Sequence, residues 1–189
     1  MRKLKILIKG ETINLCIPTV EFARKSQWYN WLNDPNITRH LSINYKNFKN
    51  TQKMQEKFFT KEKKKRLFLI ISTKNNIYKG VVSLSNINKN KHTCGIALIT
   101  DVNIEPALSA YAGLEAIARL TEYTFKTMNI KKICGAGLLK LRNWQQRMEL
   151  FGYRVESIKK NDYLNGKKLA DSHQVSCTYV DYVAILKKR

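Results

Sequence analysis

The spacing of apolar residues along the chain switches between the period of a strand and the period of a helix. Apolar and polar residues alternate on both sides of Gly10, which predicts an N-terminal β-hairpin. Farther along, short apolar runs bounded by polar turns predict strands. Longer stretches with apolar residues every three or four positions predict helices. The prediction places helices at 19–33, 48–66, 114–128 and 142–152, and strands at 4–8, 13–17, 67–72, 79–87, 94–100, 131–139, 153–158 and 176–186.

This order of elements predicts one three-layer α+β domain over 1–189, with about four helices around a mixed, mostly antiparallel sheet of about seven strands. A hydrophobic content of 43% is enough for one core in a chain of 189 residues. No apolar run approaches the roughly 20 residues of a membrane helix. Lysines interrupt the apolar residues at the start of the chain, which favours a strand over a signal peptide. We therefore expect no membrane partner.

The four cysteines and three histidines are scattered along the chain. Their spacing matches neither a zinc site nor a disulfide framework. We therefore expect no metal, and reduced thiols are simplest to explain in a cytoplasmic protein.

The chain is strongly basic, with 35 Lys and Arg residues against 14 Asp and Glu residues and a net charge of +21. This charge fits an anionic small molecule such as a nucleotide or coenzyme, and it also fits a nucleic acid or the ribosome. Biased codon usage explains it equally well. The one dense basic run, 61–66, has no interleaved aromatic residue and is interpreted as the solvated end of a helix. Specific binding of nucleic acid is not expected.

Four segments, taken in order, resemble the GNAT acetyltransferase superfamily, in particular its aminosugar-nucleotide and ribosomal-protein branches. These segments are "WLNDPNITRHLS", "YKGVVSLSNINKNKHTCGIAL", "GLEAIARLTEYTFKTMNIKKI" and "MELFGYRVES". The resemblance implies the superfamily's fold and acetyl-CoA as acyl donor.

In that superfamily, the backbone of a glycine-containing loop before the long helix holds the coenzyme pyrophosphate. The matching stretch here is 108–113, where Leu108 replaces a basic or amide residue and Tyr111 replaces the first glycine. Free N–H groups at a helix start favour an anion whatever the side chains are. An ordinary strand-to-helix loop is the alternative. The coenzyme-binding residues implied by the resemblance are Ile99, Thr100, Leu108, Ser109, Ala110, Tyr111, Ala112, Gly113 and Asn143.

Two positions of the late helix bear on the pantetheine arm and the leaving thiolate. Asn143 either fixes the pantetheine arm, as the resemblance implies, or caps the helix. Met148 occupies the place of the tyrosine that protonates the thiolate in many relatives. We therefore expect a mechanism led by positioning rather than by a single acid.

The catalytic candidates are Asp101, Glu105 and Tyr111, which lie at the end of the third meander strand or just after it. Each also has a structural explanation, as a turn cap, a helix start or a packing residue. The resemblance implies that the early helix-loop segment borders the acceptor site. The substrate-binding candidates are Trp31, Asn33 and Asp34 of that segment, together with His92 before the third strand.

The sequence thus favours an acetyl-CoA-dependent N-acetyltransferase. The expected acceptor is a small anionic molecule, the amine of a nucleotide-linked aminosugar from surface-glycan biosynthesis. One alternative is acetylation of a protein N-terminus. Another is a catalytically degenerate binding module with the same fold. The sequence leaves a homo-oligomer open.

Overall fold

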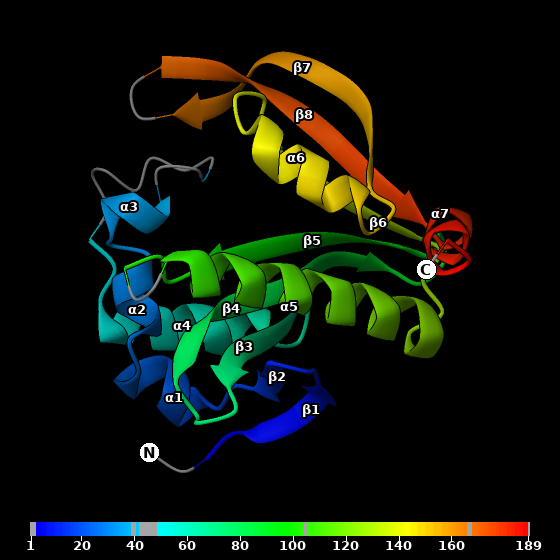
Figure 1. Cartoon of the computed structure of the whole chain (residues 1–189). Helices are drawn as coiled ribbons and strands as arrows, with labels where there is room; N and C mark the ends of the chain where they lie inside the picture. The colour runs from blue at the N-terminus through cyan, green and yellow to red at the C-terminus, as the bar shows by residue number, and fades with distance from the viewer. Residues whose placement is uncertain (1–2, 39–40, 42–48, 104–105, 166–167, 189) are drawn as a thin grey trace.

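The strands form one antiparallel-dominated sheet whose order departs from chain order only at its last two members. The structure, a computed structural model, describes residues 3–38, 41, 49–103, 106–165 and 168–188. Within these ranges, eight strands lie in the order β1-β2-β3-β4-β5-β6-β8-β7 (Figure 1). The strands are β1 (Lys5–Lys9), β2 (Ile13–Ile17), β3 (Leu67–Thr73), β4 (Tyr78–Asn88), β5 (Thr93–Thr100), β6 (Lys132–Leu138), β7 (Arg154–Asn165) and β8 (Lys168–Thr178).

Helices cover both faces of the sheet, which makes three layers (Figure 1). One core lies between the sheet and α5, α6 and α7, and a second lies between the sheet and α1, α2 and α4. None of the helices within the described residues is long and apolar enough to cross a membrane. The helices are α1 (Val20–Lys25), α2 (Trp28–Trp31), α3 (Pro35–Thr38), α4 (Gln52–Glu62), α5 (Pro106–Thr127), α6 (Arg142–Glu149) and α7 (Tyr179–Leu186).

Helix α5 lies close to β5 because its inner face is built from small residues. Ser109, Ala112 and Ala116 are buried there. A Cβ atom on Gly113 would stand 3.0 Å from both Leu98 Cδ2 and Thr100 Cγ2. Gly113 therefore sets the distance between the helix and the strand.

The only parallel pair in the described sheet, β5 and β6, is joined over a short length. Its register covers three residue pairs, from Thr93↔Lys132 to Gly95↔Cys134. Beyond them, the carboxyl-terminal halves of the two strands are not paired with each other. β5 stays paired with β4 up to Thr100, and β6 stays paired with β8 up to Leu138. The sheet therefore opens between these two strands.

The predicted α+β architecture is confirmed, but the described residues form eight strands and seven helices where about seven and four were predicted, and several element boundaries need correction. The predicted helix at 19–33 is two helices, because α1 ends at Lys25 and its C-cap residue Ser26 is extended. Pro35 ends that stretch as expected, and it also begins α3, since proline fits the first turn of a helix. Helix α5 begins at Pro106, eight residues before the predicted start at 114.

The end of the chain was predicted as a strand over 176–186, and this is wrong. β8 ends at Thr178 and α7 follows at once. Thr178 and Asp181 form a capping box, in which each side chain accepts from the other residue's backbone N–H. This local signal outweighs the β-branched and aromatic residues of the segment. The preceding stretch was predicted as a connection, but its described residues, 161–165 and 168–171, belong to the paired strands β7 and β8.

Candidate active site

The opening between β5 and β6 forms a cleft with a volume of about 320 Å³. β5 supplies Ile96 to Thr100 along one wall, and β6 supplies the small residues 135–137 along the other. Most of the remaining surface comes from helix α6, strand β8 and residues in or near α3. The described lining residues are Asn36, Ile37, Leu41, Ile96, Ala97, Leu98, Ile99, Thr100, Val102, Ile117, Gly135, Ala136, Gly137, Leu141, Trp144, Met148, Tyr163, His173 and Val175.

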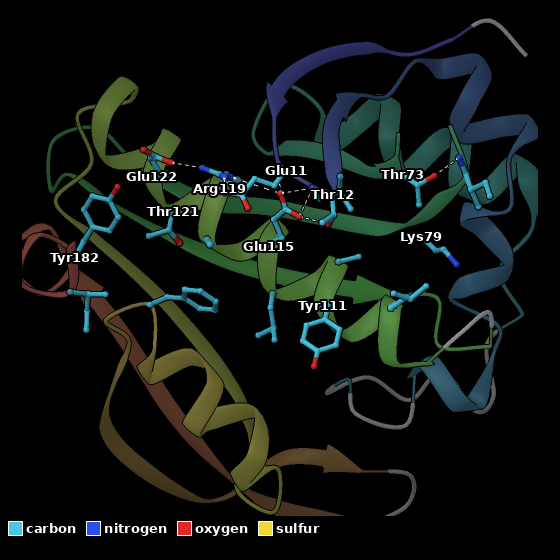
Figure 2. A pocket seen from close by; sticks show the side chains of 18 of the residues that line it. Glu11, Thr12, Thr73, Lys79, Tyr111, Glu115, Arg119, Thr121, Glu122 and Tyr182 are labelled. Atoms are coloured by element: carbon cyan, nitrogen blue, oxygen red, sulfur yellow. Dashed lines mark hydrogen bonds and ion pairs between the residues drawn. The ribbon is translucent and has the colours of Figure 1, made fainter. Parts of the chain in front are cut away.

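A larger groove, of about 1180 Å³, runs along the outer face of α5 (Figure 2). Four of its charged side chains, Glu11, Glu115, Arg119 and Glu122, form ion pairs with one another. The Arg119 guanidinium lies 2.7 Å from a Glu11 carboxylate oxygen and 3.4 Å from one of Glu122. The groove and the cleft are about equally open to solvent, but only the cleft lies beside the part of the β5 edge that has no partner on β6. The cleft is therefore the stronger candidate for the active site, although its volume is smaller.

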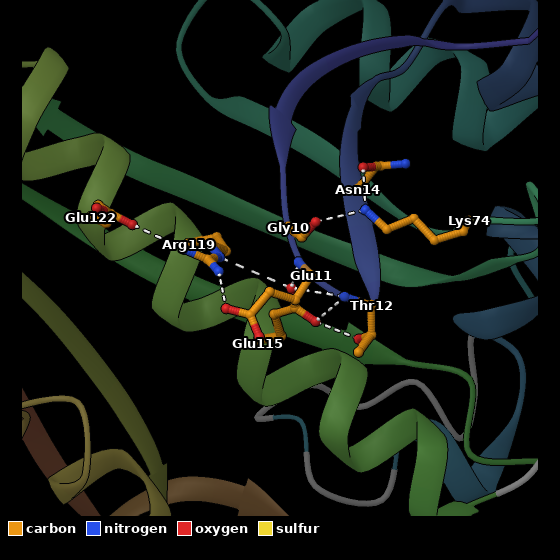
Figure 3. Close-up of polar contacts among 8 residues, drawn as sticks. All are labelled: Gly10, Glu11, Thr12, Asn14, Lys74, Glu115, Arg119 and Glu122. Carbon is orange, nitrogen blue, oxygen red and sulfur yellow. Dashed lines mark hydrogen bonds and ion pairs between the residues drawn. The ribbon is translucent and has the colours of Figure 1, made fainter. Parts of the chain in front are cut away.

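The polar contacts beside the large groove tie the β1–β2 hairpin to α5 (Figure 3). The Glu115 carboxylate accepts from the backbone N–H groups of Glu11 and Thr12 and from the Thr12 hydroxyl. The Lys74 ammonium donates to the Gly10 carbonyl at 2.6 Å. Because these bonds satisfy the hairpin turn, we interpret the cluster as structural.

Three of the predicted site residues meet at the carboxyl end of β5, beside the cleft. The Trp31 indole N–H donates to Asp101 Oδ2 at 3.1 Å. The Asn103 backbone N–H donates to Asp101 Oδ1 at 3.1 Å, and the Asn103 side chain donates to the Asp34 carboxylate. The early segment therefore does border the cleft. The residues that line it there are Asn36 and Ile37, a few positions after the predicted ones.

The other predicted acceptor residues lie elsewhere. Asn33 pairs with the backbone of Asn50, at 2.8 and 2.6 Å. His92 precedes β5 at the strand's opposite end from Asp101, and its Nδ1 lies 2.8 Å from the Asn129 carbonyl oxygen. Glu105 lies outside the described residues.

The predicted coenzyme loop has to be corrected, because it is helical. α5 begins at Pro106, so the N–H groups from Ala110 onward bond within the helix and are not available to an anion. Leu108 and Tyr111 are 55% and 68% exposed, and with Ala112 they line the large groove rather than the cleft. Gly113 is a packing residue. Ile99 and Thr100, by contrast, do line the cleft.

Asn143 is an exposed residue within α6 and does not cap it. The N-cap is Leu141, which makes no side-chain cap bond. Trp144, which follows Asn143, lines the cleft, as do Leu141 and the buried Met148.

The sequence did not point to His173, which lines the cleft from β8. The residue is 1% exposed, and its Nδ1 has no hydrogen-bond partner among the described residues. Burial lowers the pKa of His173 below its ordinary value of 6.5, which favours the neutral imidazole. A strand prediction that began at Lys168, eight residues earlier, would have placed His173, Val175 and Cys177 on one inward face.

No cysteine belongs to the part of the cleft lining that the structure describes. Burial raises the pKa of the Cys94 thiol to about 12, which removes thiolate character at neutral pH. The arrangement is therefore suited to direct transfer between two bound molecules. A cysteine-linked intermediate has no support here.

Comparisons with solved structures show the same architecture in known acetyltransferases. No protein-family model matches the sequence, and no curated protein does. A spermidine N-acetyltransferase from Vibrio cholerae, solved with CoA and spermine, superposes with a TM-score of 0.80 at 16% identity, over 91% of this chain and 98% of that one. A GNAT-family acetyltransferase from Bacillus anthracis gives 0.71 at 16% identity, over 90% and 97%. Neither of these neighbours is described as an aminosugar or ribosomal-protein acetyltransferase. The chain thus has the fold of the GNAT acetyltransferases.

Proposed function

We propose that the protein is an acetyl-CoA-dependent N-acetyltransferase that works in the β5–β6 cleft. The observation that carries the proposal is the open parallel pair, which leaves the β5 edge from Ile96 to Thr100 without a strand partner on β6. The pantetheine arm of CoA carries amide groups, and an exposed strand edge can pair with such groups as it does with an added strand. The solved CoA complex of the Vibrio cholerae enzyme, which has the same fold, supports this coenzyme.

The phosphates of the coenzyme fit the start of α5. This helix has 22 residues, and the N–H groups of Ala107 and Leu108 lie in its first turn, where no intrahelical acceptor exists. Such a helix end favours an anion. The proposed phosphate site thus lies nearer the start of the helix than the sequence predicted. Lys140 and the exposed Arg142, at the start of α6, add positive charge beside the cleft.

The reaction needs little beyond positioning. A neutral amine attacks the thioester carbonyl, a C–N bond forms, and the C–S bond breaks to release the CoA thiolate. Because a thioester is already activated, holding the two reactants in line supplies much of the rate. The cleft, with mostly apolar residues on both strands, is suited to that task.

The acceptor we propose is an amine on an anionic small molecule, with a nucleotide-linked aminosugar as the first choice. The net charge of +21 favours an anion. A polyamine is the second candidate, because the Vibrio cholerae neighbour is a spermidine N-acetyltransferase. However, the described cleft lining includes no carboxylate that would attract a polycation. The four free thiols are consistent with a cytoplasmic enzyme.

The test combines calorimetry with a thiol-release assay. We expect saturable binding of acetyl-CoA and CoA, and CoA release with a UDP-linked aminosugar but not with spermidine or a peptide N-terminus. No binding at millimolar CoA would overturn the acetyltransferase proposal. Release with spermidine alone would keep the enzyme and replace the acceptor.

A binding module with this fold would behave differently with RNA. Phosphate-backbone contacts release counterions, so the affinity of such a module falls by about 10³–10⁵ between 50 and 200 mM salt for 6–10 contacts. We expect weak RNA binding that is lost near physiological salt, while acetyl transfer persists. Tight RNA binding at physiological salt, without CoA release from any amine, would favour the module.

A further inference from the structure

His173 combines a buried side chain with an unpaired ring nitrogen beside the cleft. Its imidazole is almost completely buried, and its Nδ1 has no hydrogen-bond partner among the described residues. An unpaired polar atom costs free energy when it is buried, so native proteins rarely keep one without a role. The ring lines the cleft in which we propose that acetyl transfer takes place.

The neighbouring strand makes room for this ring. His173 on β8 pairs with Gly137 on β6. A Cβ atom at Gly137 would lie 3.2 Å from both Cε1 and Nε2 of the imidazole. Any larger residue at 137 would crowd the ring. The glycine therefore allows His173 to lie beside the open strand edge.

The cleft offers few other groups that could move a proton. Of the described residues that line it, only His173 and Tyr163 have titratable side chains. Asp101, at the end of β5, already accepts bonds from Trp31 and Asn103. Met148 stands on α6 where the resemblance to acetyltransferases implies a tyrosine acid.

We propose that His173 is the proton-transfer group of this cleft and serves both halves of the reaction. This inference rests on the proposed acetyl transfer. As the C–N bond forms, the imidazole accepts the proton that the acceptor nitrogen loses. As the C–S bond breaks, the imidazolium returns that proton to the CoA thiolate. Atoms and charge balance without a further reactant, and the histidine ends in its starting state.

The surroundings of the ring suit this cycle. The neutral imidazole required at the start is favoured because burial lowers the pKa of His173. Its strand neighbours are Gly137 on β6 and Ile158 on β7, and Trp144 and Met148 of α6 line the same cleft. None of these four carries charge. Tyr163 of β7 is the one other titratable group in the described lining.

The first test does not depend on knowing the acceptor. The chain has three histidines, so substituting His40 and His92 with glutamine leaves His173 as the single imidazole signal in an NMR spectrum. Saturating CoA should shift the His173 ring nitrogens. The His92 ring, held against the Asn129 carbonyl at the opposite end of β5 from Asp101, should not respond in the wild type. An unchanged His173 signal with CoA bound would overturn the proposal.

The second test is kinetic. His173→Gln should lower kcat by about 10²–10⁴-fold and remove the acidic limb of the pH–rate profile that belongs to the imidazole, with acetyl-CoA affinity kept by calorimetry. His92→Gln is the matched control and should stay within about twofold of wild type. Equal activity and an unchanged profile in His173→Gln would refute the role. Absence of CoA binding in the wild-type protein would instead remove the proposed function, and this inference with it.

Discussion

Trp31 on α2 donates its indole N–H to the carboxylate of Asp101, 70 positions later, at a distance of 3.1 Å. The bond joins the helical layer formed by the early segment to the carboxyl end of β5, at the edge of the cleft. Trp31 is 3% exposed, so water does not replace the donor when it is lost. The pair therefore fixes the position of the strand end as well as stabilising the fold.

We expect Trp31→Phe and Asp101→Ala to be coupled. A hydrogen bond to a charged group contributes about 1.5–3 kcal/mol, and partners in direct contact are not additive. Urea unfolding of both single variants and the double variant should give an interaction free energy of about 1 kcal/mol or more. Simple additivity of the two losses would show that the bond contributes nothing in solution.

The same carboxylate gives a test of the base assignment. In Asp101→Asn an oxygen still accepts from Trp31, so we expect a turnover loss below about tenfold. If Asp101 were instead the general base, turnover would fall by about 10²–10⁴-fold with stability unchanged. Thiol release measured beside His173→Gln distinguishes the two residues.

Gly113→Ala should separate stability from coenzyme binding. Alanine gains about 1 kcal/mol of helix propensity over glycine. The new methyl group must push aside Leu98 and Thr100, whose nearest atoms would be 3.0 Å away. Both of these residues line the cleft, so their displacement changes the shape of its β5 wall. We expect an unfolding free energy within about 1 kcal/mol of wild type and weaker binding of acetyl-CoA by calorimetry. Unchanged affinity would mean that this wall of the cleft does not contact the coenzyme.

Glu115→Ala should loosen the N-terminal hairpin. The carboxylate is 16% exposed and holds two backbone N–H groups and one hydroxyl of the turn. We expect a loss of about 2 kcal/mol by urea unfolding and faster hydrogen exchange at the Thr12 amide. Glu122→Ala is the control on the same helix, since its ion pairs are more exposed and should contribute less than about 1 kcal/mol. Equal losses in the two variants would contradict the special role of Glu115.

The cap of α7 should weaken in acid. The Thr178 hydroxyl, its backbone N–H and Arg154 together lower the pKa of Asp181 below its ordinary value of 3.8. Because the folded-state pKa is the lower one, the stabilisation is complete above 3.8 and disappears as the pH falls through the lowered value. Amide exchange across α7 should rise over that window in the wild type. Asp181→Asn should already show the faster exchange at neutral pH, and a pH-independent exchange pattern in the wild type would disprove the account.

The regular elements could be predicted because their signals are local. Alternation in β2 buries Ile13 and Leu15, and the apolar stripe of α5 buries Ile117 and Leu120 as expected. The start of α5 was misplaced because small residues such as Ser109 and Ala112 fit a loop as well as a tightly packed helix. Only the packing against β5 decides between the two.

The candidate site was less predictable because it depends on contacts between distant residues. Trp31 and Asp101 were each proposed from the sequence, but their bond depends on how α2 docks beside the sheet. His173 was missed because its role rests on its register with Gly137 and on the opening of β5 from β6. Neither relationship leaves a local pattern in the sequence.

The short junction between β5 and β6 also bears on the mechanics of the molecule. Its three residue pairs are fewer than those of any other strand pair in the described sheet. The sheet thus consists of two extensively paired parts, β1 to β5 and β6 to β8, which are joined by this short pairing and bridged by α5. A ligand bound between these two parts contacts both of them, so it stabilises the junction that has the fewest residue pairs. In such a protein, ligand binding and the cooperativity of unfolding are thermodynamically linked.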